Sequence, residues 1–170
     1  MDKLEELLKN PLTDLQKQAL TDKSYKKTSN NQDCKINFEL ATYGDAILKC
    51  ALCKIYFERE NKDNFGFKGK LTEWKKQYES DEVLVRVVAK HYNLLDFLKY
   101  DKEGNGKPEE QKPQDYEHKG QNDNDKHKYI ATAMEACIAA VYLENGENEV
   151  VEIVKKWIRW IDKGANFSDT

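Results

Sequence analysis

The chain has 170 residues, of which 35% are charged, and its formal net charge is -3. This length suits one domain with a sizeable core, and we expect a single domain over residues 1–170. The slightly acidic balance excludes a generally basic nucleic-acid coat, although lysines can still gather on one face.

The chain begins with two short amphipathic helical patterns. Leucines at helical spacing define the first, and Thr13 with Gln16 has the spacing of a capping box at the start of the second. The opening residues are charged and contain no apolar signal core, so we expect an intracellular, cytoplasmic protein without a membrane partner. Residues 23–35 are polar, and we expect a loop there.

Residues 36–57 predict one long helix that is apolar on almost every side, and such a helix belongs at the centre of a fold. Asp45, directly after Gly44, is the one formal charge that we place in its buried half. A buried carboxylate without a partner either destabilises the fold or takes up a proton, so Asp45 needs a cation, a set of donors or a cleft. The alternative is an aspartate on a solvated stripe.

After an expected turn, two helical patterns follow over residues 71–78 and 81–92, the second with Ser80 as its N-cap. From residue 101 to 128 there is no aliphatic side chain, which predicts a long polar loop that is either functional or mobile. Residues 150–161 predict a closing amphipathic helix. Since no run of alternating β-branched residues occurs, we predict an all-α fold.

Residues 130–143 are still more uniformly apolar, and only Thr132 and Glu135 carry polar side chains. This stretch is too short to span a bilayer, so it predicts a second core helix. If the two core helices pack side by side, Asp45 and Glu135 can meet. Facing carboxylates repel each other unless a cation lies between them, and oxygen ligands of this kind bind magnesium. The pair therefore predicts a metal site for Mg²⁺, with Mn²⁺ as a substitute.

Four cysteines raise the question of a disulfide or a zinc site. Cys50 and Cys53 form a C-x-x-C inside the central helix, but no second C-x-x-C follows. Cys34 and Cys137 have no ligand-like spacing to a histidine. We expect buried free thiols and no zinc.

Four stretches carry motifs: residues 20–25 (LTDKSY), 37–48 (NFELATYGDAIL), 68–72 (KGKLT) and 131–143 (ATAMEACIAAVYL). In this order they resemble the signature motifs of the ribonuclease III family, and the resemblance covers nearly the whole chain. The resemblance implies an all-α endonuclease domain that cuts double-stranded RNA as a two-fold homodimer. In the family, four acids at each site hold magnesium.

The chain departs from the family pattern at two of the four acids. Ala41 stands where the family has its first glutamate, and Thr132 stands where it has an aspartate, whereas Asp45 and Glu135 match the other two. The same replacements resemble the Mini-ribonuclease III subgroup, whose members lack a double-stranded-RNA-binding domain and are still nucleases. As in that subgroup, we expect no such domain in this sequence. It differs from the subgroup in keeping the opening motif and the Gly-x-Leu-Thr stretch.

The resemblance gives the two retained acids a mechanism. A magnesium ion between Asp45 and Glu135 would lower the pKa of a bound water and polarise the scissile phosphate. Asn37, Thr132 and the neighbouring Ala41 are candidates for the layer around the metal and its waters. Two alternatives remain: Asn37 caps the central helix, or Thr132 bonds its own backbone.

Candidate RNA-binding residues lie just before the second core helix. Lys126, His127 and Lys128 precede the helix of Glu135 and are placed to meet phosphate near the metal. Lys23, in the opening motif, is a further candidate.

The homodimer follows from the number of sites, because one domain offers a single acid pair and cutting both strands needs a second copy. We expect small Gly44 to let the partner approach closely. Thr42 replaces the phenylalanine that resembles a knob for the partner subunit, so the expected interface is weaker or uses other aromatic residues. These are Trp74, Phe65 and Phe67, for which packing beneath the nearby turn is the alternative.

A competing class is a non-catalytic ribonuclease III fold that acts as an RNA-binding or subunit-pairing module. The loss of two acids favours this class. Retention of Asp45 and Glu135 on apolar helices opposes it, since a buried charge without a function costs stability. We therefore predict a metal-dependent endoribonuclease for double-stranded RNA.

Overall fold

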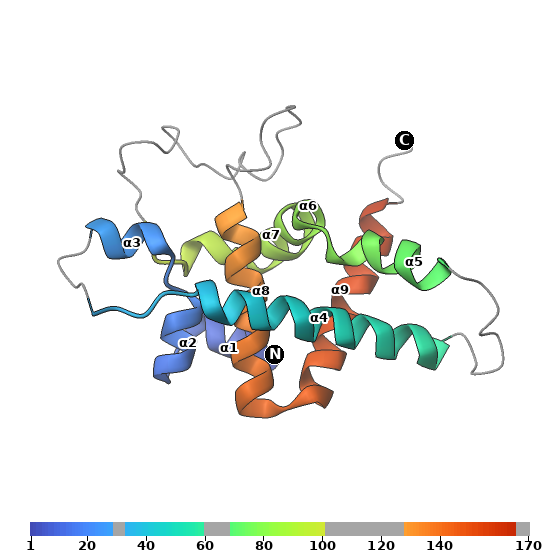
Figure 1. The fold of residues 1–170 in the computed structure, drawn as a ribbon, viewed down its shortest axis with the longest axis horizontal. Coiled ribbons are helices and arrows are strands. Elements are labelled where there is room, and N and C mark those ends of the chain that lie inside the picture. Colours follow the sequence, from blue (N-terminus) through green and yellow to red (C-terminus); the bar gives the residue numbers. More distant parts are fainter. Residues whose placement is uncertain (29–32, 60–68, 101–127, 166–170) are drawn as a thin grey trace.

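The computed structural model describes residues 1–28, 33–59, 69–100 and 128–165 (Figure 1). All regular structure in these ranges is helical, apart from one isolated bridge between Thr21 and Lys99, so the all-α prediction is confirmed. Residues 61–68 of the expected turn (61–70) and residues 101–127 of the expected polar loop (101–128) lie outside the described residues. None of the described helices has both the length and the apolar composition needed to cross a membrane.

Two long helices cross at the centre of the fold, as the apolar patterns predict. In Figure 1, α4 (Phe38–Arg59) runs along the long axis, and α8 (Lys128–Asn145) and α9 (Glu147–Ala165) run roughly across it. The three helices bury the largest part of the core, because their apolar faces meet where they cross. Gly146, with a φ of 85°, makes the tight turn between α8 and α9.

Gly44 lies at the point where α4 crosses α8. A Cβ atom at this position would fall 1.8 Å from the carbonyl oxygen of Glu135 and 3.3 Å from the backbone nitrogen of Ala139. The absent side chain therefore permits the close approach of α8 within the same chain. This corrects the expectation that Gly44 makes room for a partner subunit.

One face of α4 remains exposed, which corrects the expectation of a helix that is apolar and buried on almost every side. Phe38 and Tyr43 are 62% and 44% exposed. The ring of Tyr43 meets that of Tyr142 on α8 edge to face, with 6.0 Å between the centroids. This face stays open because α8 and α9 cover only one side of α4.

The four cysteines are free, but they are not all buried as expected. Cys137 is buried, Cys34 and Cys53 are partly buried, and Cys50 is exposed. Cys50 is exposed because the helical period places it on the open face of α4.

The N-terminal helices confirm one local prediction and correct another. Thr13 and Gln16 form the predicted capping box at the start of α2. Residues 23–28, expected to be loop, form the short helix α3 instead. Asp22 starts it, since its carboxylate accepts a hydrogen bond from the backbone N–H of Ser24 at 2.8 Å. The bounds are α1 (Lys3–Lys9), α2 (Asp14–Ala19) and α3 (Lys23–Thr28).

A run of short helices connects α4 to the site region. Ser80 is the predicted N-cap, because its hydroxyl accepts a hydrogen bond from the Val83 N–H at 3.3 Å. Asn93, which has a left-handed φ of 51°, separates the last two elements of the run. Its elements are α5 (Lys70–Glu79), α6 (Asp81–Val83), the π-helical η1 (Leu84–Ala89), α7 (Lys90–Tyr92) and the 3-10 turn η2 (Leu94–Asp96).

Candidate active site

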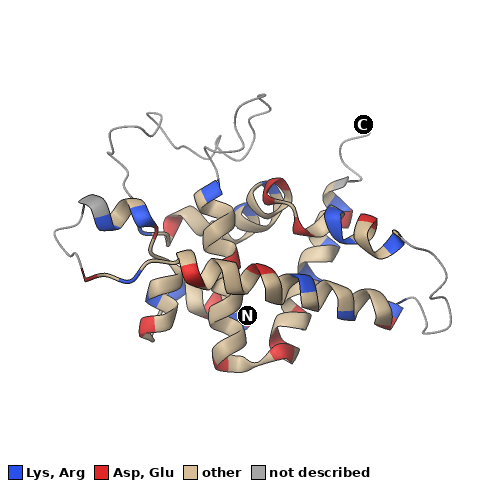
Figure 2. Ribbon diagram, viewed as in Figure 1, with Lys and Arg blue, Asp and Glu red and all other residues tan. Residues whose placement is uncertain are grey.

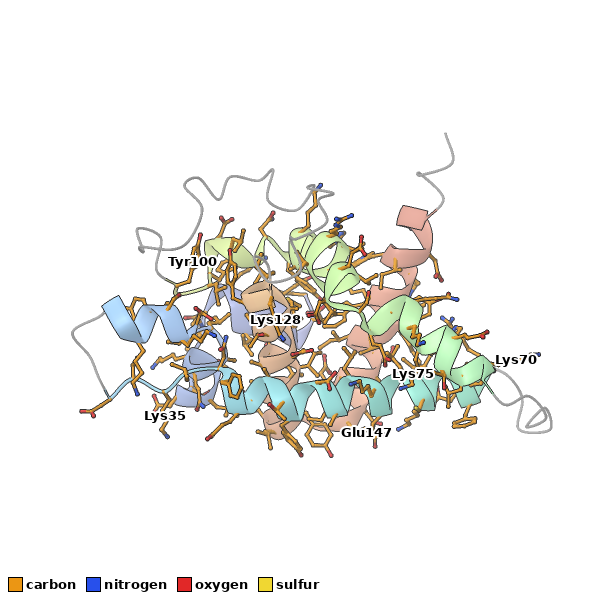
Figure 3. All side chains as sticks on the ribbon, turned by 45° about the horizontal axis from the view of Figure 1, so that its top comes forward. Lys35, Lys70, Lys75, Tyr100, Lys128 and Glu147 are labelled. Carbon is orange, nitrogen blue, oxygen red and sulfur yellow. The ribbon has the colours of Figure 1, made fainter. Side chains whose placement is uncertain are left out.

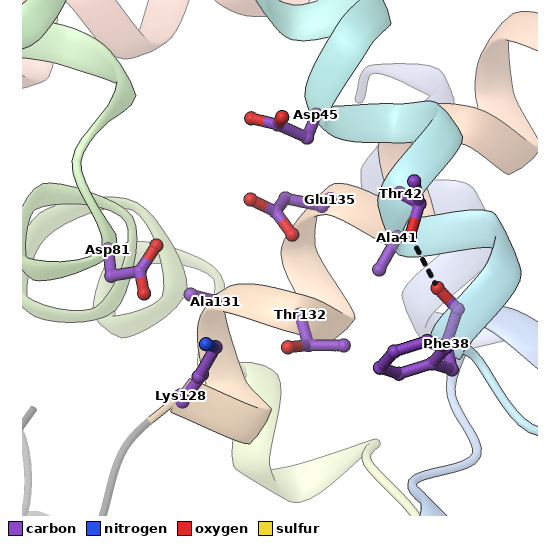
Figure 4. Close-up of a pocket in the computed structure, with 9 residues that line it drawn as sticks. All are labelled: Phe38, Ala41, Thr42, Asp45, Asp81, Lys128, Ala131, Thr132 and Glu135. Atoms are coloured by element: carbon purple, nitrogen blue, oxygen red, sulfur yellow. Dashed lines mark hydrogen bonds between the residues drawn. The ribbon is translucent and has the colours of Figure 1, made fainter. Parts of the chain in front are cut away.

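A cavity of about 400 Å³ lies where the first half of α4, the start of α8 and the start of α6 come together. Figure 4 shows the side chains around it. The nine residues that line it are Phe38, Ala41, Thr42, Asp45, Asp81, Lys128, Ala131, Thr132 and Glu135.

Asp45 and Glu135 reach this cavity from two different helices. Asp45 comes from α4, and Glu135 comes from α8, directly at the crossing that Gly44 permits. In Figure 4 both carboxylates point into the same space. The structure thus brings together the two acids that the sequence analysis paired.

The environment of the cavity raises the pKa of Glu135. Burial raises its pKa first, and the negative charges of Asp45 and Asp81 raise it further, to about 7. Lys49 and Lys128 oppose this shift. Within the described part of the chain, Glu135 forms no hydrogen bond or ion pair, so near neutral pH its negative charge is incompletely balanced.

Asp45 has a partner that the sequence analysis missed. The ammonium of Lys49 lies 2.6 Å from Asp45 Oδ2, and the two side chains are 43% and 35% exposed. The hydrogen bond to Asp45 raises the pKa of Lys49, and the charges of Glu79 and Glu135 add to the effect. The signal was present in the sequence, since an acid four residues before a lysine pairs on a helix surface.

Asp81 is a third acid at the cavity, which the sequence analysis treated only as a residue of the first turn of a helix. Asp81 directly follows the N-cap Ser80, and an acid is common in the first turn of a helix because it complements the helix dipole. This explanation needs no cavity, so the sequence analysis did not consider a further role. The structure turns its carboxylate toward the space shared by Asp45 and Glu135 (Figure 4).

The predicted RNA-binding residues are only partly described. Lys128 is the first residue of α8 and lines the cavity. Figure 3 places it between the ends of the molecule marked by Lys35 and Lys70. Figure 2 shows blue residues on α5, which in the view of Figure 1 lies on the same side of α4 as the start of α8. Lys23 is exposed on α3 and does not line the cavity. The other two predicted residues, Lys126 and His127, lie outside the described residues.

Three residues were candidates for the layer around a metal. Ala41 and Thr132 line the cavity together with Asp45 and Glu135. Asn37 is buried and does not line it. The Asn37 amide donates to the Ala19 carbonyl at 3.4 Å, and its backbone carbonyl accepts the Ala41 N–H at 2.8 Å. These contacts fit the alternative in which Asn37 starts α4.

The donor chemistry of the cavity suits a hard divalent cation. Its charged ligand groups are carboxylates, which suit Mg²⁺ and Mn²⁺, and no cysteine or histidine of the described ranges lines it. No three histidine, cysteine, aspartate or glutamate side chains of the described ranges are close enough to hold an ion on their own. A cation here would therefore depend on water and on a substrate phosphate for its remaining ligands.

Comparison with known proteins gives a consistent picture. A family model described as Ribonuclease-III-like matches residues 13–160. The chain is similar to a structure of the nuclease domain of ribonuclease III from Campylobacter jejuni that concerns flexibility in a region involved in dimer formation. The identity is 26%, the TM-score is 0.58, and 95% of each chain is covered. A 2.2 Å crystal structure of the same nuclease domain is also 26% identical, with a TM-score of 0.59 and coverage of 95% of this chain and 93% of that chain.

Proposed function

This chain belongs to the ribonuclease III-like family, and from that membership we propose that it is a metal-dependent endoribonuclease that hydrolyses double-stranded RNA in RNA processing. The observation that carries the proposal is the pair Asp45 and Glu135, which meet in one cavity at the crossing of α4 and α8. The similarity to nuclease domains of ribonuclease III supports it.

The proposed mechanism assigns a task to each charged residue of the cavity. Asp45 and Glu135 would hold Mg²⁺ or Mn²⁺, which when bound would supply an activated water and polarise the scissile phosphate. Glu135 must be ionised to act as a ligand, so its raised pKa makes metal binding weaker in acid. Lys128 would attract the phosphate at the edge of the cavity.

We also propose a homodimer with one such site in each subunit. The family likeness supports this, and α4 and α8 carry exposed apolar side chains that a partner could cover: Phe38, Tyr43 and Leu143. Trp74 packs on Tyr78, with 4.8 Å between the ring centroids, which supports the alternative of ordinary packing for this residue. Phe65 and Phe67 lie outside the described residues.

The direct test is cleavage of a long RNA duplex. The purified protein is incubated with the duplex and Mn²⁺, and fragment lengths and ends are read on a sequencing gel. We expect short duplexes with staggered ends, and light scattering over a dilution series should show a dimer where cleavage occurs. A protein that stays monomeric and still leaves staggered ends would contradict the two-subunit arrangement, and an absence of cleavage would contradict the nuclease.

One observation favours the non-catalytic alternative, in which the fold only binds RNA or pairs subunits. Lys49 already supplies a cation to Asp45, so this acid does not need a metal for charge balance. Glu135 has no equivalent partner among the described residues. The non-catalytic alternative gives no function to this half-buried acid, whose pKa is raised. A protein that binds duplex RNA in Mn²⁺ without cutting it would establish the alternative.

Restoring the two missing acids should lower the metal requirement. In Ala41→Glu with Thr132→Asp, two carboxylates join a cavity that already holds Asp45 and Glu135. We expect the Mg²⁺ concentration for half-maximal cleavage to fall by roughly ten-fold, because metal affinity follows the number of charged ligands.

The matched control for the restored acids is Thr72→Asp with Gln77→Glu. It adds the same charge on exposed positions of α5, outside the cavity. An equal fall in the Mg²⁺ requirement for both double variants would mean that positions 41 and 132 do not face the metal.

Removing the charge of Lys128 should weaken RNA binding without changing the fold. In Lys128→Gln we expect the slope of log K against log salt to become shallower by about 1, since each phosphate contact contributes about that much. Filter binding in Ca²⁺ or EDTA measures the slope without cleavage. The control is Lys17→Gln, which changes an exposed lysine on α2, and an equal slope in all three proteins would put the phosphate contacts elsewhere.

A further inference from the structure

The Lys49 side chain occupies an unusual place for a surface lysine, because its partner is one of the two candidate metal ligands. Its ammonium lies 2.6 Å from Asp45 Oδ2, one helical turn away on α4. Lys49 is 43% exposed, so its stem is free to move. By contrast, Lys54 on the same helix pairs with Glu147 of α9, away from the cavity.

The carboxylates around Lys49 explain why its ammonium lies beside Asp45. Asp45 and Glu135 point into the same cavity, and a nearby ammonium relieves the repulsion between their carboxylates. Glu79 also attracts Lys49, although its own closest cation is Lys75, at 3.3 Å. Lys49 thus lies among three carboxylates and bonds directly to one of them.

From this geometry we infer that Lys49 is a built-in cation that competes with the divalent ion for the Asp45 carboxylate. This inference rests on the proposed function. An ammonium at hydrogen-bonding distance from Asp45 Oδ2 repels a divalent ion at the same carboxylate, so each cation weakens the binding of the other. Glu79 offers the displaced Lys49 another partner.

The competition has a consequence for the order of binding. With Lys49 in place, the Asp45 and Glu135 pair carries one net negative charge instead of two, so free metal binds weakly. A substrate phosphate brings further negative oxygen ligands to the cavity and shifts the balance toward the divalent ion. Metal and RNA are therefore expected to bind cooperatively, each raising the affinity for the other.

The test measures Mn²⁺ binding by calorimetry without RNA, so that no cleavage is involved. Lys49→Met should bind Mn²⁺ tighter than the parent by roughly ten-fold, the scale expected when one nearby charge is removed from a partly solvated site. Lys49→Arg, which keeps the charge, and Lys54→Met, which removes a lysine from the same helix outside the cavity, should bind like the parent.

A second readout needs no metal at all. In EDTA at pH 8, Lys49→Met should lower the thermal midpoint, because the two carboxylates lose their cation. In the Asp45→Asn background the same change should have little further effect, so a double-mutant cycle isolates the pair. Equal losses in both backgrounds would mean that Lys49 supports the fold through its stem and not as the cation of Asp45, which overturns the inference.

The outcomes separate this inference from the proposed function. If the parent binds Mn²⁺, Asp45→Asn does not, and Lys49→Met binds no tighter than Lys54→Met, only the competition is overturned. If Asp45→Asn binds Mn²⁺ as well as the parent, the proposed metal site falls and the competition falls with it. If Lys49→Met binds no Mn²⁺, the competition is overturned.

Discussion

Replacing Asp45 by Asn, or Glu135 by Gln, should abolish cleavage of duplex RNA while the fold survives. The two carboxylates are the only acids from the crossing of α4 and α8 at the cavity, and each variant removes a negative charge that a divalent cation needs. Groups that stabilise charge in a transition state are worth roughly 10²–10³-fold in rate each, so we expect a loss of at least this size. Single-turnover cleavage in saturating Mn²⁺ measures it.

The control for lost activity is Glu152→Gln, which removes an exposed acid of α9 that pairs with Lys155. This variant should cleave like the parent. Activity that survives in both Asp45→Asn and Glu135→Gln would rule out the two-carboxylate mechanism.

The Glu135→Gln variant should also be more stable than the parent, in a manner that depends on pH. The folded protein raises the pKa of Glu135 from 4.5 to about 7, so between these values the folded state binds more protons than the unfolded state. The parent therefore loses stability as the pH rises through this window. We expect an advantage of roughly 1–3 kcal/mol for the variant at pH 8 in EDTA, after allowance for solvent screening.

Urea unfolding at pH 8 and pH 5 checks this dependence. The advantage of Glu135→Gln should shrink toward pH 5, where Glu135 of the folded parent is protonated. An advantage that stays constant between the two pH values would show that the gain does not come from the charge of Glu135.

The sequence predicted the centre of the fold because two apolar helices have no stable place except in a core. The same reasoning paired Asp45 with Glu135. An isolated acid on such a helix needs a cation, and one cation between the two helices can serve both acids. The sequence analysis assigned Gly44 to a contact with a partner subunit, which was wrong, because the neighbour of a small residue cannot be read from the pattern of its own helix. Only the structure shows that it faces the backbone of α8.

The remaining differences have local causes. Residues 23–28 look like a loop by composition, but the capping hydrogen bond from Ser24 to Asp22 favours a short helix. Asp81 already had a sufficient explanation as a residue of a helix start, and Lys49 was a common surface residue until its partner was known. Patterns of single elements were therefore predictable, whereas cavity residues from a third element were not.

Replacing Gly44 by Ala should produce the largest loss of stability of any change considered for this chain. The new Cβ would lie 1.8 Å from the carbonyl oxygen of Glu135 and 2.5 Å from its carbonyl carbon. Both are backbone atoms of α8, so no flexible side chain can yield, and the two helices must separate. We expect a loss of at least about 3 kcal/mol, well above the gain of about 1 kcal/mol that alanine brings to a helix.

Gly164→Ala is the matched control, because Gly164 also lies in a helix and its added Cβ would meet nothing within 4 Å. Its stability in urea should equal or exceed that of the parent by up to about 1 kcal/mol. Since the contact at Gly44 is with Glu135 itself, any Gly44→Ala protein that still folds should hold Glu135 away from Asp45 and cut RNA poorly. If Gly44→Ala is as stable and active as the parent, α4 and α8 do not cross as closely as the candidate site requires.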